Sequence, residues 1–155
     1  MTPQRETLTE PMSKTRLRLW LKLLKTSSRI EGELRRRFRD KFATTLPRFD
    51  VMAALSRFPD GLKMSELSDL LRVSNGNVTG IVDRLTNDGH ALRVAVPGDR
   101  RAQLARLTAA GQAAFAELAQ AHEAWLDELL QGLDAADAAV LHSLLGKTEG
   151  ETDAQ

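Results

Sequence analysis

The chain has 155 residues, of which 42% are apolar and 28% charged, a composition typical of one soluble globular domain with a hydrophobic core. It has no cysteine, which excludes disulfides, thiolate zinc sites and cysteine-based redox sensing and favours a cytoplasmic location. No apolar run is long enough for a membrane span or a secretion signal, so we expect neither.

The formal net charge of +1 conceals an asymmetry along the chain. Residues 14–41 carry eleven basic and three acidic side chains, a balance of +8, whereas residues 108–155 carry one basic and nine acidic, a balance of −8. This division predicts a surface with one side that attracts a polyanion and another that repels it. Two solvated helix faces of opposite sign would give the same pattern.

Residues 1–12 are polar, contain two prolines and show no apolar period, so they are predicted to form a flexible arm. From Ser13 to Phe42, apolar residues recur at three- and four-residue spacing without a proline, which predicts a helix of about thirty residues. So long a helix cannot bury its apolar stripe within its own domain, and residues 13–45 are predicted to be an N-terminal dimerisation helix. Its basic start, LRLWLKLLK, also fits a membrane surface or a partner's groove. We expect no membrane partner, because the stripe continues to Phe42.

Residues 46–107 are predicted to form a DNA-binding lobe. A helix from Leu46 to Phe58 has Pro47 in its first turn, where the missing N–H costs nothing, and ends at a Pro-Asp-Gly turn. Two more helices, residues 65–71 and 75–88, are separated by only three residues, and so tight a connection is typical of a helix-turn-helix.

The second helix of this pair has the clearest pattern in the sequence. Ser74 is a suitable N-cap, and four apolar residues follow at i, i+3, i+4 and i+7: Val78, Ile81, Val82 and Leu85. At 100° per residue the opposite face carries Gly76, Gly80, Asp83 and Asn87. Glycine inside a helix costs up to about 1 kcal/mol relative to alanine. Close approach to a nucleic acid would justify these glycines; otherwise they are merely tolerated.

A β-hairpin is predicted to follow this helix. Gly89 is expected to close the helix in a left-handed conformation. Leu92, Val94 and Val96 then alternate with Arg93 and Ala95, as in a half-buried strand whose inner face carries the larger apolar residues. A turn over residues 97–99 leads to a return strand over about 102–107, and the tip reads PGDRR.

Residues 108–146 are predicted to be C-terminal dimerisation helices. Thr108 is expected to cap a long helix whose apolar stripe runs from Phe115 to Leu129. Gly132 is expected to end it, and Asp134 to start a final helix that reaches about Leu145. The remaining residues, 147–155, are assigned to a tail.

The predicted fold is mainly α with a small β-hairpin: a winged helix-turn-helix domain flanked by long terminal helices. From about Leu17 to Leu145 the chain resembles the multiple-antibiotic-resistance regulator (MarR) family of transcription factors. Two segments carry the resemblance: GDRRAQLARLTAAG resembles the family's wing motif D-x-R followed by L-T-x-x-G, and SNGNVTGIVDRLTNDG is similar to its recognition helix. The resemblance implies a dimeric regulator that binds a near-palindromic operator in double-stranded DNA. It also implies a repressor that a small effector releases from the operator.

The predicted DNA contacts follow from physics and from the resemblance. A helix N-terminus favours phosphate, and short polar side chains there reach base edges in the major groove. The resemblance implies that Arg101 enters the minor groove while Asp99 braces it; an intramolecular salt bridge without DNA contact is the alternative. The complete predicted set is Arg72, Ser74, Asn75, Gly76, Asn77, Thr79, Gly80, Arg84, Asp99, Arg100 and Arg101.

An effector pocket is implied between the dimer interface and the DNA-binding lobe. The residues proposed for it are Trp20, Leu24, Arg36, Arg37, Phe49, Met52, His122 and Trp125, although aromatic and Met stripes at helical spacing are usually core. The segments LPRFDVMAAL and VSNGNVTG look most like members tied to aromatic-acid catabolism, which indicates an aryl carboxylate or aryl-CoA thioester. The arginines from Arg35 to Arg39 fit three roles: they contact DNA phosphates, they bind an anionic effector, or they are solvated.

No catalytic motif is present, so we expect no enzyme, no cofactor and no metal site. The three histidines fall on separate elements, and there is no Gly-rich phosphate loop, H-E-x-x-H pattern or nucleophile elbow. Two other functions use the same features. A non-specific architectural DNA-binding protein would bind most sequences equally, and a winged-helix interaction module would bind protein instead.

Overall fold

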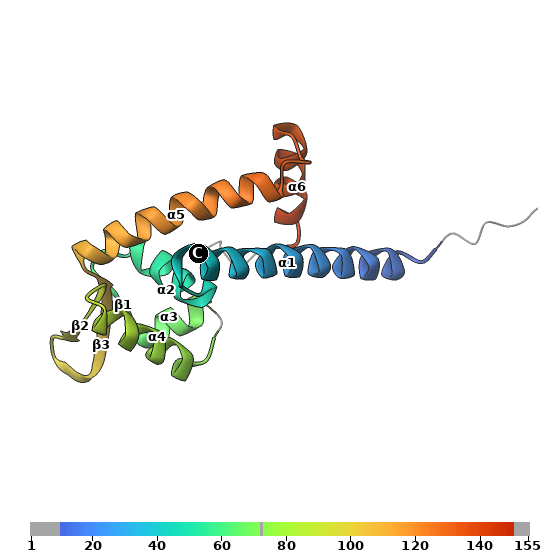
Figure 1. Cartoon of the computed structure of the whole chain (residues 1–155). Coiled ribbons are helices and arrows are strands. Elements are labelled where there is room, and N and C mark those ends of the chain that lie inside the picture. Colours follow the sequence, from blue (N-terminus) through green and yellow to red (C-terminus); the bar gives the residue numbers. More distant parts are fainter. Residues whose placement is uncertain (1–9, 72, 151–155) are drawn as a thin grey trace, which may run out of the picture. The chain divides into compact units, whose positions relative to one another are not determined.

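The computed structural model of the chain describes residues 10–71 and 73–150, and for Arg100 the backbone alone (Figure 1). Arg72, most of the predicted arm and the end of the predicted tail therefore lie outside the described residues. The chain divides into two compact units with their boundary between Leu46 and Pro47, and each is described by itself.

The first unit is dominated by one long helix, α1 (Met12–Phe42), which begins one residue before the predicted start. Leu34 and Phe38 are buried, whereas every residue from Pro11 to Lys22 is exposed, including apolar ones. The helix ends at Ala43, whose left-handed φ of 49° lets its N–H and the next one return to the carbonyls of Arg39 and Phe38.

In the second unit, three helices form the helix-turn-helix lobe: α2 (Leu46–Ser56), α3 (Met64–Leu71) and α4 (Asn75–Asn87). The predicted end of α2 at Phe58 is wrong by two residues. Proline disfavours the helical conformation in the residue before it, and Phe58 precedes Pro59. The largest fully buried side chains of this unit are Met52, Leu55, Leu67, Leu85, Val51, Val78 and Val82.

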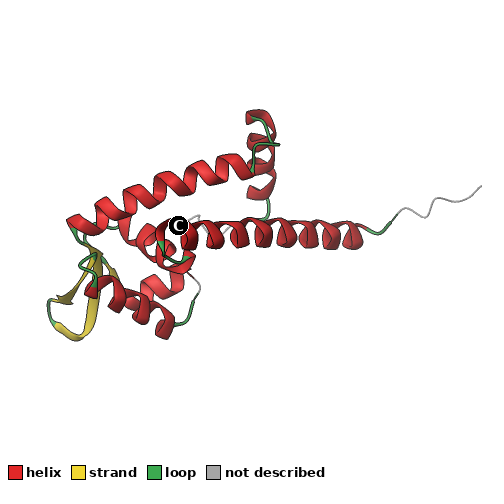
Figure 2. Ribbon diagram, viewed as in Figure 1, coloured by secondary structure: helices red, strands yellow, loops and turns green. Residues whose placement is uncertain are grey.

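The sheet has three strands rather than the predicted two, in the order β1-β3-β2, all antiparallel (Figure 2). The hairpin strands are β2 (Ala91–Val96) and β3 (Asp99–Leu107), and β1 (Leu62–Lys63) pairs with the outer edge of β3. A two-residue strand has no detectable period, so only its partner in space defines it.

The predicted alternation of β2 holds only toward the wing tip, where Val94 and Val96 are half-buried and Ala95 is exposed; at the start of the strand it is reversed. Leu92 is 44% exposed, whereas Ala91 is 1% exposed and Arg93 is partly buried. The register explains the reversal, because Ala91 pairs with Leu107 and Arg93 pairs with Ala105, and paired residues share a face. Leu107 and Ala105 are both buried, so this face packs inward and carries Arg93 with it.

Two helices follow the sheet, α5 (Ala109–Leu129) and α6 (Ala135–Gly146). Both predicted caps are confirmed: Thr108 accepts the N–H of Gly111, and Asp134 forms a capping box with Asp137. All of α6 is exposed, including Val140 and Leu144 at 59% and 50%. No helix in the described part of the chain is both long and apolar enough to cross a bilayer.

Candidate nucleic-acid interface

The N-terminus of α4 is an open, polar end. The hydroxyl of Ser74 accepts the N–H of Asn77 at 3.3 Å, which confirms the predicted cap. The four predicted apolar positions of α4 are buried, so its opposite face is presented outward. On or beside that face the predicted contact residues Asn75, Gly76, Asn77 and Arg84 are exposed, while Thr79 and Gly80 are half-buried.

Neither glycine on this face packs against the rest of the described chain. A Cβ built on Gly76 or Gly80 would meet nothing within 4 Å. Internal crowding therefore does not explain them, and both leave a smooth surface on the first turns of α4.

One acidic residue on this face is neutralised by the sheet. Asp83 lies 2.6 Å from the Arg93 guanidinium, measured from Oδ1 to Nη2. The pair ties β2 to α4 and removes a charge that would repel phosphate from the open face. The sequence-based reasoning missed Arg93 because it placed that residue on the outer face of the strand; a basic residue within an apolar strand was the available indication.

The connection between α3 and α4 is held by Ser68. Its hydroxyl donates to the carbonyl of Val73, and the N–H of Val73 donates to the carbonyl of Ser68. Ser68 is buried, so the reciprocal pair satisfies its polar group while fixing the turn. The predicted phosphate contact Arg72 lies within this turn, outside the described residues.

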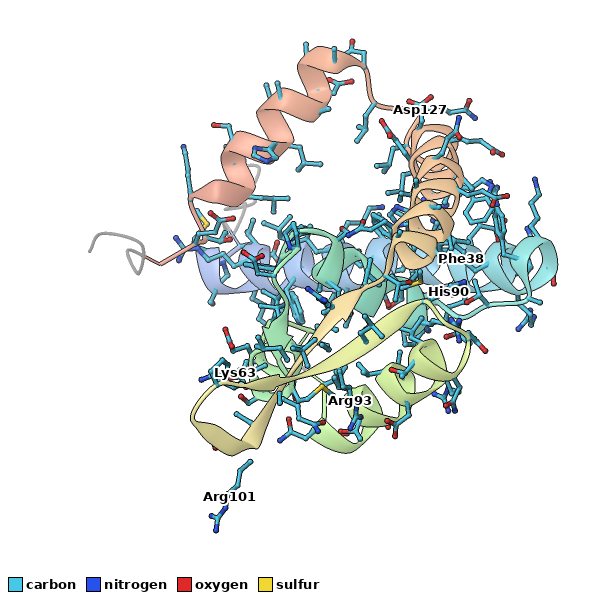
Figure 3. The ribbon with its side chains drawn as sticks, turned by 90° about the vertical axis from the view of Figure 1, so that its left-hand side faces the viewer. Phe38, Lys63, His90, Arg93, Arg101 and Asp127 are labelled. Carbon is cyan, nitrogen blue, oxygen red and sulfur yellow. The ribbon has the colours of Figure 1, made fainter. Side chains whose placement is uncertain are left out.

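The wing tip is bulged. Ala95 pairs with Gln103, yet Val96 pairs with Asp99, so residues 100–102 form an insertion on β3 after a turn at Gly98, whose φ is +83°. The carboxylate of Asp99 accepts the backbone N–H of Arg101 at 3.0 Å. This contact leaves the guanidinium of Arg101 without an ion pair in the described part of the chain, and Figure 3 shows it pointing away from the ribbon. Of Arg100, the side chain is not described.

A close joint connects the end of α4 with the start of α5. Gly89 has the predicted left-handed φ, +77°, and its carbonyl accepts the hydroxyl of Thr108 at 2.7 Å. The N–H of Thr108 donates to the carbonyl of His90 at 3.0 Å. Gly111 is buried against that same carbonyl, because a Cβ there would lie 1.9 Å from its oxygen. The L-T-x-x-G segment thus has a structural role: the cap at Thr108 was predicted, whereas the close contact of Gly111 with His90 was not.

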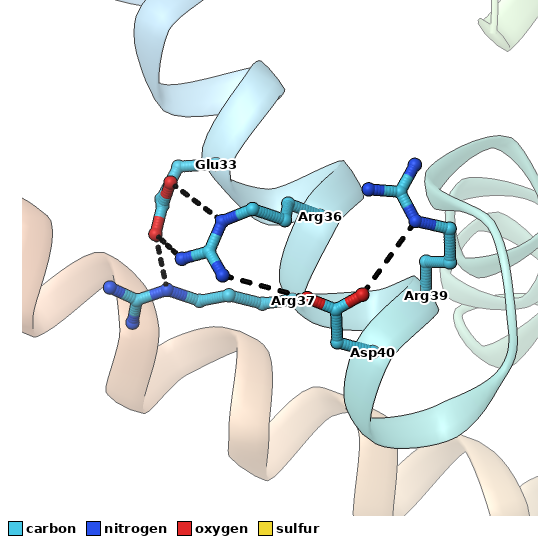
Figure 4. Close-up of polar contacts among 5 residues, drawn as sticks. All are labelled: Glu33, Arg36, Arg37, Arg39 and Asp40. Atoms are coloured by element: carbon cyan, nitrogen blue, oxygen red, sulfur yellow. Dashed lines mark hydrogen bonds and ion pairs between the residues drawn. The ribbon is translucent and has the colours of Figure 1, made fainter.

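The arginine cluster of α1 is largely paired with acids of its own helix (Figure 4). Arg36 and Arg37 both donate to Glu33, and Arg36 and Arg39 approach Asp40. The hydrogen bonds from Arg36 and then Arg37 lower the pKa of Glu33 from 4.5 to about 2 and, in return, Glu33 raises the pKa of Arg36. The largest net positive charge of α1 therefore lies nearer its start: residues 14–30 contain six basic residues and no acid, and one of the six, Arg18, pairs with Glu10 at 2.8 Å.

The predicted effector residues fall into two groups. Phe49 and His122 lie together, with ring centroids 4.5 Å apart, and Phe115 stacks on Phe49 at 5.6 Å. Burial lowers the pKa of His122. Met52 and Trp125 of the same unit are buried at 1% and 6% exposure.

The other four, Trp20, Leu24, Arg36 and Arg37, belong to α1 in the first unit. Trp20 and Leu24 are exposed, and the two arginines are engaged by Glu33. Within the described residues, no group of three or more His, Cys, Asp or Glu side chains is placed to hold a metal ion.

Comparison with known proteins gives a consistent result. The sequence profile described as "MarR family" matches residues 44–102. The transcriptional activatory protein BadR of Rhodopseudomonas palustris is 34% identical over 105 residues, a match that covers 65% of this chain and 60% of BadR. The chain thus spans less than two thirds of that relative's length.

Two solved structures extend the similarity to nearly the whole chain. A MarR family transcriptional regulator from Silicibacter pomeroyi is 35% identical, with a TM-score of 0.72, over 91% of this chain and all of that one. A mutant of MarR from E. coli, crystallised in complex with operator DNA, has the same fold, with a TM-score of 0.74 at 24% identity over 90% of this chain and 99% of that one. The wing and helix-turn-helix described above, together with these matches, show that the chain belongs to the MarR family of transcriptional regulators.

Proposed function

We propose that this protein is a dimeric regulator that binds a specific near-palindromic DNA sequence, with α4 in the major groove and the wing in the minor groove. The observation that carries the proposal is Arg101, an exposed cation at the tip of the wing whose backbone is braced by Asp99. A narrow minor groove concentrates negative potential, which attracts such an arginine. The open N-terminus of α4, capped by Ser74, supplies donors to phosphate and short side chains to base edges.

A second copy of the chain is the proposed cover for the exposed apolar helices. Trp20 and Leu24 on α1 are 57% and 46% exposed, and Val140 and Leu144 on α6 are 59% and 50% exposed. Monomers rarely leave so many large apolar side chains in water. We accordingly assign residues 13–45 and 108–146 to dimerisation and residues 46–107 to DNA binding.

The charges on α1, α5 and α6 also support contact between two copies of the chain. Residues 14–30 of α1 carry six basic side chains and no acid. A hollow between α5 and α6, of about 760 Å³, has Glu123, Asp127 and Asp134 in its lining together with leucines and alanines. An apolar surface with an acidic rim is complementary to an apolar helix with basic residues.

The regulation we propose is repression by occupation of the operator, released by a small aromatic or anionic effector. The ring cluster of Phe49, Phe115 and His122 supports an aromatic ligand, because aromatic rings pair favourably with one another in stacked and edge-to-face arrangements. BadR is named an activatory protein, so the sign of regulation needs its own assay. Titration calorimetry with aryl carboxylates and aryl-CoA thioesters tests the effector; absence of binding by all of them contradicts this part of the proposal.

The DNA-binding function is tested by a gel shift on the DNA upstream of the chain's own gene, with scrambled duplex as competitor at fixed salt. We expect the wild-type complex to resist the scrambled competitor and Arg101→Ala to weaken it. Arg106→Ala, on the same strand but at its other end, is the matched control and should bind normally. Equal competition by scrambled DNA indicates an architectural protein, and no shift at all indicates a protein-interaction module; either result overturns the proposal.

A further inference from the structure

A polar hollow lies beside the wing, where β1 meets α3. Its volume is about 480 Å³, and it is lined by residues 63–65 at the β1–α3 junction and by residues 99 and 101–103 of β3. The pairing of Lys63 with Leu104 brings these two segments together. Lys63, Ser65 and Gln103 do not belong to the predicted DNA contacts, because β1 was not expected.

The lining carries excess positive charge. Lys63 is exposed and, within the described residues, its ammonium has no ion pair; the same holds for Arg101. Asp99 is the acidic residue of the lining, and one of its oxygens already accepts the N–H of Arg101. The lining thus has two cations and one carboxylate, and one oxygen of that carboxylate is already engaged. A second carboxylate, that of Glu66, lies beside the lining and accepts the backbone N–H of Lys63 at 3.2 Å.

The uncharged groups of the lining add donors. Ser65 is exposed and offers a hydroxyl. The side-chain oxygen of Gln103 accepts from the Arg93 guanidinium at 3.4 Å, which leaves its NH₂ group to donate. An ammonium, a hydroxyl and an amide N–H together suit a ligand that accepts several hydrogen bonds and carries one negative charge, and a phosphodiester is such a ligand.

We propose that this hollow holds a backbone phosphate of bound DNA, with Lys63 as its cation. The inference rests on the DNA-binding function proposed above and adds to it a contact outside the recognition helix and the wing tip. The minor groove is about 6 Å wide and is edged by phosphates on both sides. An arginine that enters the groove at the tip brings the adjacent hollow against one of these edges, and Figure 3 shows Lys63 and Arg101 at the same end of the sheet. Such a contact positions the wing without reading sequence.

The test compares the salt dependence of DNA affinity in four proteins: wild type, Lys63→Gln, Lys63→Arg and Lys147→Gln. Fluorescence anisotropy with operator and scrambled duplexes from 50 to 300 mM salt gives the slope of log K against log salt. Loss of one phosphate contact reduces the magnitude of that negative slope by about 0.9 and weakens binding about eightfold at 0.1 M salt. We expect this loss in Lys63→Gln on both duplexes and its recovery in Lys63→Arg. Lys147 is an exposed lysine at the end of α6, outside the DNA-binding lobe, so its variant should retain the wild-type slope.

A slope for Lys63→Gln equal to that of Lys147→Gln overturns the inference while leaving the proposed function intact. A second arm adds inorganic phosphate at constant ionic strength. Competition for the hollow should weaken DNA binding by the wild type more than by Lys63→Gln. If phosphate binds the wild type and not Lys63→Gln but leaves DNA affinity unchanged, the hollow holds free phosphate rather than the DNA strand, and the inference fails. If wild type itself does not bind DNA, the proposed function fails first.

Discussion

Replacing Gly111 with alanine tests the joint between α4 and α5. The added methyl group would lie 1.9 Å from the carbonyl oxygen of His90 and 2.9 Å from its carbon, distances that real Cβ atoms do not show. The obstacle is backbone, and it already accepts the N–H of Thr108. The first turn of α5 must therefore move by about an ångström relative to His90.

The cost can be worked from these contacts. Forcing extra atoms into a packed site costs roughly 1–3 kcal/mol, and disturbing the hydrogen bond to His90 adds about 0.5–1.5 kcal/mol. Alanine recovers less than about 1 kcal/mol in helix propensity, because the position is near the helix end. These terms sum to a loss of about 0.5–4.5 kcal/mol in the free energy of unfolding of Gly111→Ala, with about 2 kcal/mol as the central expectation.

Urea denaturation followed by circular dichroism measures this loss. With a denaturant slope of roughly 2–3 kcal/mol per molar, the midpoint should fall by about 1 M. Gly132→Ala is the matched control, because a Cβ there meets nothing within 4 Å and its backbone is not left-handed. If both variants unfold at the wild-type midpoint, Gly111 is not a packing requirement and the account of the joint is refuted.

Three further predictions concern α4, α5 and α6. Gly80→Ala should raise the free energy of unfolding by up to about 1 kcal/mol while weakening operator binding; unchanged affinity in anisotropy would contradict close approach of DNA. Burial lowers the pKa of His122 below its unfolded value of 6.5, so its contribution to stability is present above that pH and lost as pH falls through the folded pKa. The melting temperature of His122→Gln should accordingly fall less between pH 7.5 and 5 than the melting temperatures of wild type and of His142→Gln. The same pH dependence in all three proteins would contradict this. Val140→Asp should produce monomers in sedimentation experiments, since it places a charge on the proposed dimer surface, and an unchanged mass would exclude that surface.

The features that sequence predicts best are local. The hydroxyl of Ser74 caps a helix whose apolar residues repeat at 3.6-residue spacing, and both determinants lie within fifteen residues. The same holds for the cap at Thr108 and the left-handed Gly89. Such features need no knowledge of what the segment packs against.

The features that sequence misses depend on distant partners. Strand β1 has only Leu62 and Lys63, and it exists because β3 lies beside it. The inner face of β2 carries Arg93 because Asp83 on α4 compensates the charge, which alternation of apolar residues alone cannot reveal. Among the candidate site residues, those of α4 and the wing lie within one unit, whereas the proposed effector residues are divided between two.

Hydroxyl-radical footprinting of the upstream DNA, combined with the mass of the complex in solution, tests the central claim most directly. Two copies per duplex should protect two sites about 34 Å apart on one face, related by an inverted repeat. One copy per duplex, or protection that ignores the base sequence, would contradict it.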